Sequence, residues 1–231
     1  MTKSALITGV SRTTGIGFHI ARGLLSRGYH VTITVRSKST SVEALTALQN
    51  SCEVHEVNLS DAASIRTFGK TFRVGHKTLD LLINNAGTLL DGEISLAQLS
   101  ATMMHDTFMV NTIAPVLIFQ EVLPLLQASS DPRVVNISSS AGQLGDGTLQ
   151  AWAPAYSASK AALNAITQQM AAAYPNLAVN SVCPGWCSTG MGGSRAPLSP
   201  EQGADTPLWL ATEVSQKISG KFFKGRTEVP W

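Results

Sequence analysis

Short apolar runs alternate along the chain with longer segments of helical periodicity. The apolar runs predict strands at residues 5–7, 31–35, 52–57, 79–83, 133–137, 178–182 and 221–223. The segments between them predict helices at about 16–28, 42–50, 61–73, 96–127, 155–173 and 200–212. Four of the strands, residues 79–83 most clearly, are almost wholly apolar, as expected where helices cover both faces of a sheet. The predicted fold class is therefore α/β, a doubly wound parallel sheet of about seven strands with helices on both faces.

Two local signals refine this pattern. Asp61 is a plausible N-cap for the third helix, and the prolines Pro115 and Pro124 predict a bend or a shortened end in the fourth. No internal repeat, low-complexity tract or linker divides the sequence. We therefore expect residues 1–231 to form a single domain.

Composition narrows the function classes. The 231 residues are 44% apolar and only 14% charged, which indicates either unusually complete burial or an apolar face covered by another subunit. A dispersed net charge of +2 argues against binding to nucleic acid or membranes. The most apolar stretch, residues 113–126, is interrupted by Gln120 and Glu121 and is too short to span a bilayer. Nothing before residue 5 resembles a signal peptide, so we expect a soluble cytoplasmic protein.

Neither the cysteines nor the histidines have the spacing of a metal site. The three cysteines contain no CxxC pair, and the histidines are scattered, so no disulfide framework and no metal centre is expected; they are Cys52, Cys183 and Cys187, with His19, His30, His55, His76 and His105.

One pair on the fifth helix carries chemistry. Tyr156 and Lys160 are four residues apart, so they share one helical face. An adjacent ammonium favours the phenolate and should lower the pKa of Tyr156 from its usual value near ~10. Such a tyrosine suits a general acid that protonates an alkoxide formed by hydride transfer. The same spacing also occurs on unrelated helices, so the pair needs support from other motifs.

A glycine-rich turn between the first strand and the first helix gives that support. It contains Gly9, Gly15 and Gly17. Glycines at this place permit a tight turn and let the backbone approach a pyrophosphate at the helix N-terminus. The alternative is an ordinary turn. The location of these glycines after a strand and before a helix makes that alternative less attractive.

Taken together, these motifs resemble the non-extended branch of the short-chain dehydrogenase/reductase family, and within it carbonyl reductases. The resemblance runs almost end to end; it covers the glycine turn, residues 84–87, Asn111, residues 136–139, Tyr156 with Lys160, residues 184–189 and 200–204, and Trp231. It implies that Ser139 orients the substrate, Tyr156 is the general acid, Lys160 supports it, and Asn111 holds a water that connects Lys160 to solvent.

The second strand ends without the acidic residue that would bind a ribose 2′-hydroxyl. Arg36 stands there instead, followed by Ser37, and its guanidinium suits a 2′-phosphate, so we expect NADP(H). Solvated loop cations are the alternative. The resemblance places the cofactor on residues from six segments, which are Gly9, Ser11, Arg12, Gly15, Ile16 and Gly17; Arg36 and Ser37; Asn58 and Leu59; Asn85, Ala86 and Gly87; Tyr156 and Lys160; and Pro184, Gly185 and Thr189. For Asn85, a structural and a binding role are equally open.

This sequence departs from the family in its turn, which has five residues between the first two glycines where the family has three. The role of Arg12 is therefore open. A glycine-rich lid at about residues 190–200 suggests an open pocket, which Trp152 and Trp186 could line.

The sequence thus predicts an NADPH-dependent reductase of small carbonyl compounds. A 3-oxoacyl thioester reductase and a non-catalytic NADP(H)-binding regulator are the alternatives. Ser139 and Tyr156 are 17 residues apart, so the long insertion of monomeric carbonyl reductases is absent, and we expect a homodimer or homotetramer. Light scattering that found only a 24.4 kDa species would contradict this.

Overall fold

The computed structural model describes residues 2–49, 51–145 and 151–231. Its strands are β1 (Ser4–Ile7), β2 (His30–Val35), β3 (Glu53–Glu56), β4 (Leu81–Asn84), β5 (Arg133–Ile137), β6 (Ala178–Cys183), β7 (Lys221–Lys224) and β8 (Thr227–Val229). They form one sheet in the order β3-β2-β1-β4-β5-β6-β7-β8, parallel throughout except for the pair β7 and β8. The predicted doubly wound sheet is confirmed.

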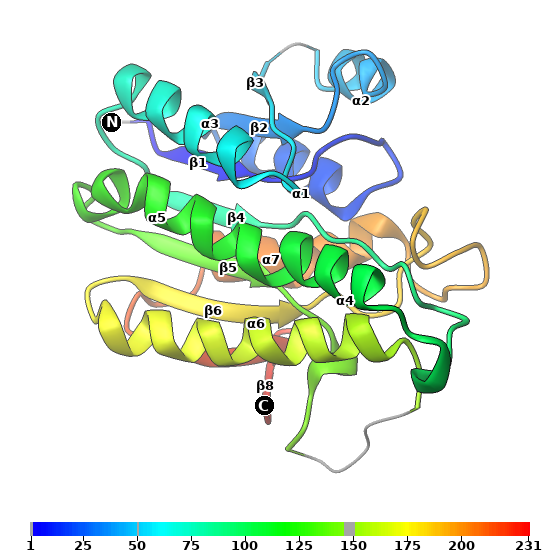
Figure 1. Cartoon of the computed structure of the whole chain (residues 1–231). Coiled ribbons are helices and arrows are strands. Elements are labelled where there is room, and N and C mark those ends of the chain that lie inside the picture. Colours follow the sequence, from blue (N-terminus) through cyan, green and yellow to red (C-terminus); the bar gives the residue numbers. More distant parts are fainter. Residues whose placement is uncertain (1, 50, 146–150) are drawn as a thin grey trace.

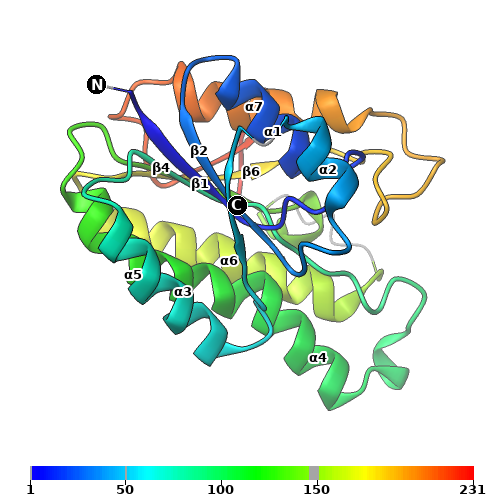
Figure 2. The same cartoon turned by 90° about the horizontal axis from the view of Figure 1, so that it is seen from above.

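Helices cover both faces of the sheet (Figure 2). They are α1 (Ile16–Leu25), α2 (Val42–Ala47), α3 (Ala62–Gly75), α4 (Ala101–Phe108), α5 (Ala114–Gln127), α6 (Pro154–Ala173) and α7 (Pro200–Thr212). Helices α1, α2 and α7 lie on one face, and α3 to α6 lie on the other (Figure 2). The predicted cap is confirmed, because Asp61 accepts a hydrogen bond from the amide of Ala63 at 2.9 Å. Residue 50 of the second predicted helix lies outside the described residues.

The apolar core consists of two clusters, one on each side of the sheet. The first packs Ile20 and Leu24 of α1 and Leu210 of α7 against β1 and β2. The second packs Phe68 and Phe72 of α3 with residues of α5 and α6 against the other face. This burial of the strands on both faces explains why the sequence of the strands is almost continuously apolar.

The fourth predicted helix, residues 96–127, is not one regular helix. A 3₁₀ turn (Leu96–Gln98) precedes α4, and a π-helical turn (Met109–Ile113) joins α4 to α5. Pro115 lies in the first turn of α5, where a missing N–H costs little, so it starts a helix rather than bending one. Helices α4 and α5 with this turn, Ala101–Gln127, are long and apolar enough to cross a bilayer, but 56% of the most apolar window is buried inside the protein, as in a core helix.

Strand β8 was not predicted from the sequence. It pairs antiparallel with β7 through a two-residue turn in which Gly225 and Arg226 both have positive φ, 56° and 61°. The two central residues of such a hairpin turn are usually Asn-Gly or Asp-Gly. Here an arginine takes the second position, so the signal is weak.

The first turn of α6 is held by a residue from a distant loop. Pro154 begins the helix, and Ala153 before it has a left-handed backbone (φ 45°) and offers no side-chain cap. The carboxylate of Asp91 takes the place of a cap, because its Oδ2 accepts the N–H of Ala155 at 2.5 Å and that of Tyr156 at 3.4 Å. Asp91 is fully buried. It therefore fixes the start of the helix that carries the predicted catalytic pair.

We expect Asp91→Ala to lower the free energy of unfolding by about 1–3 kcal/mol, because it leaves buried N–H groups of α6 without an acceptor. Asp91→Asn keeps one acceptor oxygen and should lose less. Urea denaturation of the two variants beside the wild type measures this. If Asp91→Ala unfolded with the wild-type free energy, the carboxylate would not be what holds α6.

Candidate active site

The carboxyl ends of the parallel strands gather the predicted site at one edge of the sheet. The glycine-rich turn after β1 and the lid before α7 lie at this same end of the molecule (Figure 1). The N-terminal half of α6 reaches it from the other face. An open parallel sheet binds its ligands at this edge.

The glycine turn approaches the end of β4 so closely that a side chain would not fit. Gly9 has φ +75°, and a Cβ built on it would lie 2.8 Å from the Cα of Ala86. The side-chain amide of Asn85 donates to the carbonyls of Thr8 at 2.8 Å and Gly9 at 3.2 Å. The structure thus gives Asn85 a bracing role in the turn, and Gly17 leaves the space that its side chain occupies.

The enlarged part of the turn is tied to its surroundings. Thr13 donates to Glu43 of α2 at 2.8 Å. The guanidinium of Arg12 lies against Gly190, the first residue of the lid. Gly15 is the N-cap of α1 and forms no side-chain cap, so the first N–H groups of that helix remain available to an anion.

Arg36 lies on the surface directly after β2, as predicted. No carboxylate of the described residues forms an ion pair with it. Glu56, at the end of the neighbouring strand, accepts a hydrogen bond from the N–H of Lys38 at 2.7 Å. The oxygen of Asn58 is engaged as well, because it accepts the N–H of Ser60 at 3.1 Å.

The other predicted cofactor residues lie along the same edge. Ser11 and Ile16 flank Arg12 and Gly15 in the turn, and Ser37 and Leu59 follow β2 and β3. Gly87 is adjacent to the predicted catalytic lysine, since a Cβ on it would lie 3.6 Å from Nζ of Lys160. Pro184, Gly185 and Thr189 follow β6, where Gly185 has φ +83°.

Lys160 is buried, with only 3% of its surface exposed. Its Nζ donates to the carbonyl of Ile137 at 2.8 Å. Burial lowers the pKa of Lys160 to about 8, because the ammonium has lost most of its solvation. Near neutral pH the site therefore holds a buried positive charge, for which the part of the chain that the structure describes supplies one acceptor.

The prediction that Lys160 lowers the pKa of Tyr156 is wrong for this state of the protein. The ammonium points to Ile137 and lies 5.7 Å from the centre of the tyrosine ring. Burial instead raises the pKa of Tyr156 to about 12, and the hydrogen bond with Ser139 opposes this only in part. Loss of water around the phenol outweighs a charge that is not directed at it.

Ser139 is the serine nearest in effect to Tyr156. It follows β5 with an extended backbone, and its hydroxyl acts to lower the pKa of the tyrosine. Ser138 faces the backbone of α6 instead, where its hydroxyl donates to the carbonyl of Lys160 at 3.4 Å. Ser140 begins a short 3₁₀ turn and contacts Cys183. The geometry agrees with the choice of Ser139 among the three.

Asn111 lies fully buried in the π-helical turn. Its side-chain amide donates to the carbonyl of Thr88 at 2.9 Å and to the hydroxyl of Ser159 at 3.0 Å. Its oxygen accepts the N–H of Thr88 at 2.8 Å. Asn111 therefore connects the loop after β4 to α6; the bound water that the resemblance implies stays a prediction.

Two tryptophans stand at the mouth of the site. Trp152 is 45% exposed and meets the ring of Tyr156 edge-on, with centroids 6.0 Å apart. Trp186 is 55% exposed, and its indole N–H donates to Gly192 of the lid at 2.8 Å. Cys187, in contrast, is buried, and burial raises the pKa of its thiol, consistent with a packing residue.

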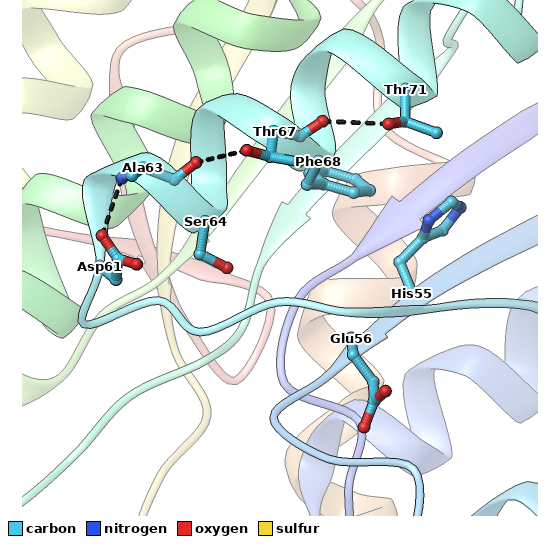
Figure 3. A pocket seen from close by; sticks show the side chains of 8 residues that line it. All are labelled: His55, Glu56, Asp61, Ala63, Ser64, Thr67, Phe68 and Thr71. Carbon is cyan, nitrogen blue, oxygen red and sulfur yellow. Dashed lines mark hydrogen bonds between the residues drawn. The ribbon is translucent and has the colours of Figure 1, made fainter.

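A pocket of about 420 Å³ lies elsewhere, between β3 and α3. Figure 3 shows it, with His55 beside Phe68 and with Glu56 pointing away from both. Its lining contains none of the predicted site residues; it consists of His55, Glu56, Asp61, Ala63, Ser64, Thr67, Phe68 and Thr71. Hydroxyls of Thr67 and Thr71 on its wall are bonded to their own helix. We place the chemistry at the edge that carries Tyr156.

Asp91, whose carboxylate binds the N–H of Tyr156, was not predicted from the sequence. An aspartate before a glycine reads as a turn, and only the fold brings residues 91 and 155 together.

Comparison with known proteins agrees with this geometry. A family model described as short chain dehydrogenase matches residues 3–198. The (+)-neomenthol dehydrogenase of Arabidopsis thaliana is 30% identical over 287 residues, which covers 97% of this chain and 96% of that protein. The (-)-isopiperitenone reductase of Mentha piperita is 28% identical, over 95% of each.

Solved structures resemble it over its whole length. NADPH-bound carbonyl reductase from chicken fatty liver has a TM-score of 0.88 and 28% identity, covering 100% of this chain and 99% of that one. Carbonyl reductase Sniffer of D. melanogaster has a TM-score of 0.91 and 26% identity, with 100% of both chains covered. The chain belongs to the short-chain dehydrogenase family, as an oxidoreductase that uses a nicotinamide cofactor and a small-molecule substrate.

Proposed function

We propose that this protein reduces a carbonyl compound to an alcohol with NADPH, and that Tyr156 is the general acid. The observation that carries the proposal is the convergence of Tyr156, Ser139 and Lys160 at the strand edge that holds the glycine turn. The relatives of this chain include reductases and a dehydrogenase, which supports the reaction class.

The residues at this edge fit a dinucleotide. Lys160 has three N–H donors, and among the described residues it has one acceptor, Ile137, so it has donors to spare for ribose hydroxyls. The uncapped start of α1 suits a diphosphate, and the unpaired guanidinium of Arg36 suits a 2′-phosphate. NADPH, when bound, supplies the hydride.

The protonated phenol of Tyr156 is the form that reduction requires. With a pKa of about 12 the hydroxyl keeps its proton at neutral pH, so it is ready to protonate an alkoxide oxygen. Ser139, in contact with the same hydroxyl, can donate a hydrogen bond to that oxygen and stabilise its developing charge.

The mouth of the site supports an apolar substrate. Its exposed apolar side chains include Trp152 beside Tyr156, and Trp186 and Met191 at the lid. We propose that these side chains select small or medium-sized ketones and aldehydes. To test this, the oxidation of NADPH is measured with three classes of substrate. These are cyclic ketones, including the ketone of neomenthol; quinones; and an acetoacetyl thioester. Turnover of the thioester alone would favour the fatty-acid type of reductase, and no turnover at all would favour a regulator.

Tyr156→Phe should remove nearly all turnover, by about 10²–10⁴-fold, because the proton donor is lost while the ring remains. The dissociation constant for NADPH should stay within a few-fold of the wild type, as measured by fluorescence titration. Full activity in this variant would overturn the assignment.

The affinity for NADPH should be constant between pH 7 and about 8 and fall above it. The pKa of Lys160 is lowered to about 8, so the ammonium that faces the ligand is present below this value and lost above it. The fall should approach tenfold per pH unit if the neutral amine binds weakly. Tyr156→Phe should show the same profile, which assigns it to Lys160 rather than to the phenol. An affinity unchanged up to pH 9.5 would contradict this.

Arg36→Asp should lower kcat/KM for NADPH by about 10–100-fold or more, because a charge-assisted contact is replaced by a repulsion. The value for NADH should rise or stay unchanged, since a carboxylate can accept from the ribose 2′-hydroxyl. Lys217→Asp makes the same charge change at an exposed site near the start of β7 and is the control. An unchanged NADPH to NADH ratio in Arg36→Asp would remove the basis for NADP(H) selection.

A further inference from the structure

Three histidines meet one glutamate at the opposite edge of the sheet. Strands β2 and β3 are parallel neighbours, with Thr32 opposite Glu53. Alternate residues of a strand share a face, so His30 and Thr32 of β2 lie on the same side as Glu53 and His55 of β3. His76 follows the last residue of α3, which covers this face. Five distant positions thus form one cluster, which no sequence spacing reveals.

Three of these side chains offer ligand atoms to a common point. Nε2 of His76 lies 3.0 Å from Oε2 of Glu53, and Nε2 of His30 lies 3.8 Å from the same oxygen. All three atoms lie within 4.8 Å of one another. Ligand atoms of a tetrahedral zinc ion, at about 2.0–2.2 Å from the metal, lie about 3.3–3.6 Å apart. Small side-chain movements would therefore complete a coordination sphere.

The tautomer of His76 is set by the backbone. Its Nδ1 contacts the carbonyl of Phe72 at 2.9 Å, and because a carbonyl only accepts, Nδ1 carries the proton. In the neutral ring Nε2 then carries a lone pair, and this lone pair faces Oε2 of Glu53. Two acceptors at 3.0 Å repel each other unless a positive charge joins them. The contact requires either a second proton on His76 or a cation between the two groups.

Other contacts hold the cluster in place without occupying its open side. His55 donates through Nε2 to Oε1 of Glu53 at 2.7 Å, and Thr32 donates to Oε2 at 3.3 Å. The ring of His76 stacks on Phe72 with centroids 4.0 Å apart. Metal sites are oriented by such outer hydrogen bonds to histidine and carboxylate ligands. The imidazole of His30 is exposed and leaves a path for entry.

We propose that His30, Glu53 and His76 bind a divalent transition-metal ion of the zinc type. Two imidazoles and one carboxylate are a ligand set that suits zinc, and the fourth position is left to water. The site would link the starts of β2 and β3 to the end of α3. It is separate from the active site, because His30 and Val35 begin and end β2, about 17 Å apart in a strand. Its role is to stabilise the fold, independent of the proposed function.

The test is titration of tag-free protein with Zn²⁺, followed by calorimetry and thermal unfolding. We expect one ion per chain, and at about 100-fold excess over the dissociation constant a rise in Tm of about 5–10 °C. His30→Gln, Glu53→Gln and His76→Gln should each weaken binding at least tenfold. His30→Gln is the variant least able to disturb folding, since its side chain is exposed.

The matched control is His105→Gln, the same change at an exposed histidine outside the cluster; it should bind as the wild type does. Cys52→Ser should also leave binding intact, which excludes the thiol next to Glu53 as the ligand. Equal zinc binding by wild type and His30→Gln would overturn the proposal. The proposal would also be overturned if zinc did not change the Tm, and if the Tm varied with pH in the wild type but not in Glu53→Gln. In that case a proton on the cluster would supply the positive charge between His76 and Glu53.

Discussion

A buried ammonium group is the constraint on which the active site depends. Lys160 is almost wholly enclosed, and the Ile137 carbonyl is the acceptor that the described residues give it. Removing such a charge from water costs several kcal/mol unless partners replace the solvent. The lowered pKa of Lys160 is the direct sign of that cost. A cavity that keeps a charge so poorly compensated favours ligands rich in hydroxyl and phosphate oxygens.

Such a charge stays in place only if α6 cannot move, and polar contacts within the core hold this helix. Asn136 of β5 accepts from Asn84 at 2.8 Å and donates to Thr167 of α6 at 2.9 Å. Thr167 also bonds Ser181 of β6 at 2.8 Å. Buried polar networks favour one packing arrangement, because a shift of the helix breaks these hydrogen bonds and leaves more donors or acceptors unpaired. Apolar contacts alone would let the helix slide along the sheet.

The sequence predicted those features that depend on local chemistry. The glycine turn and the Tyr156 and Lys160 pair were readable because the turn follows a strand and the pair lies on one helical face, whereas Ser139 was chosen through the family resemblance. The pKa of Tyr156 was not readable, since the direction of the Lys160 side chain and the loss of water depend on packing. The π-helical turn around Asn111 and the reach of Asp91 to α6 likewise depend on contacts between distant segments. The hydrophobic periodicity of the sequence carries no information about the π-helical turn or about the contact of Asp91 with α6.

The histidine cluster shows the same limit in a different way. His30, Glu53 and His76 have no motif spacing, and strand register with the end of one helix is what unites them. The active edge holds features that cost free energy, such as the left-handed Ala153 and an oxygen of Asp91 without a partner among the described residues. Strain of this kind persists only where the surrounding structure is firm. Strands β2 and β3 run from the cluster to the cofactor edge, so any stabilisation at their starts supports the arrangement of Arg36 and the residues after β3 at their ends.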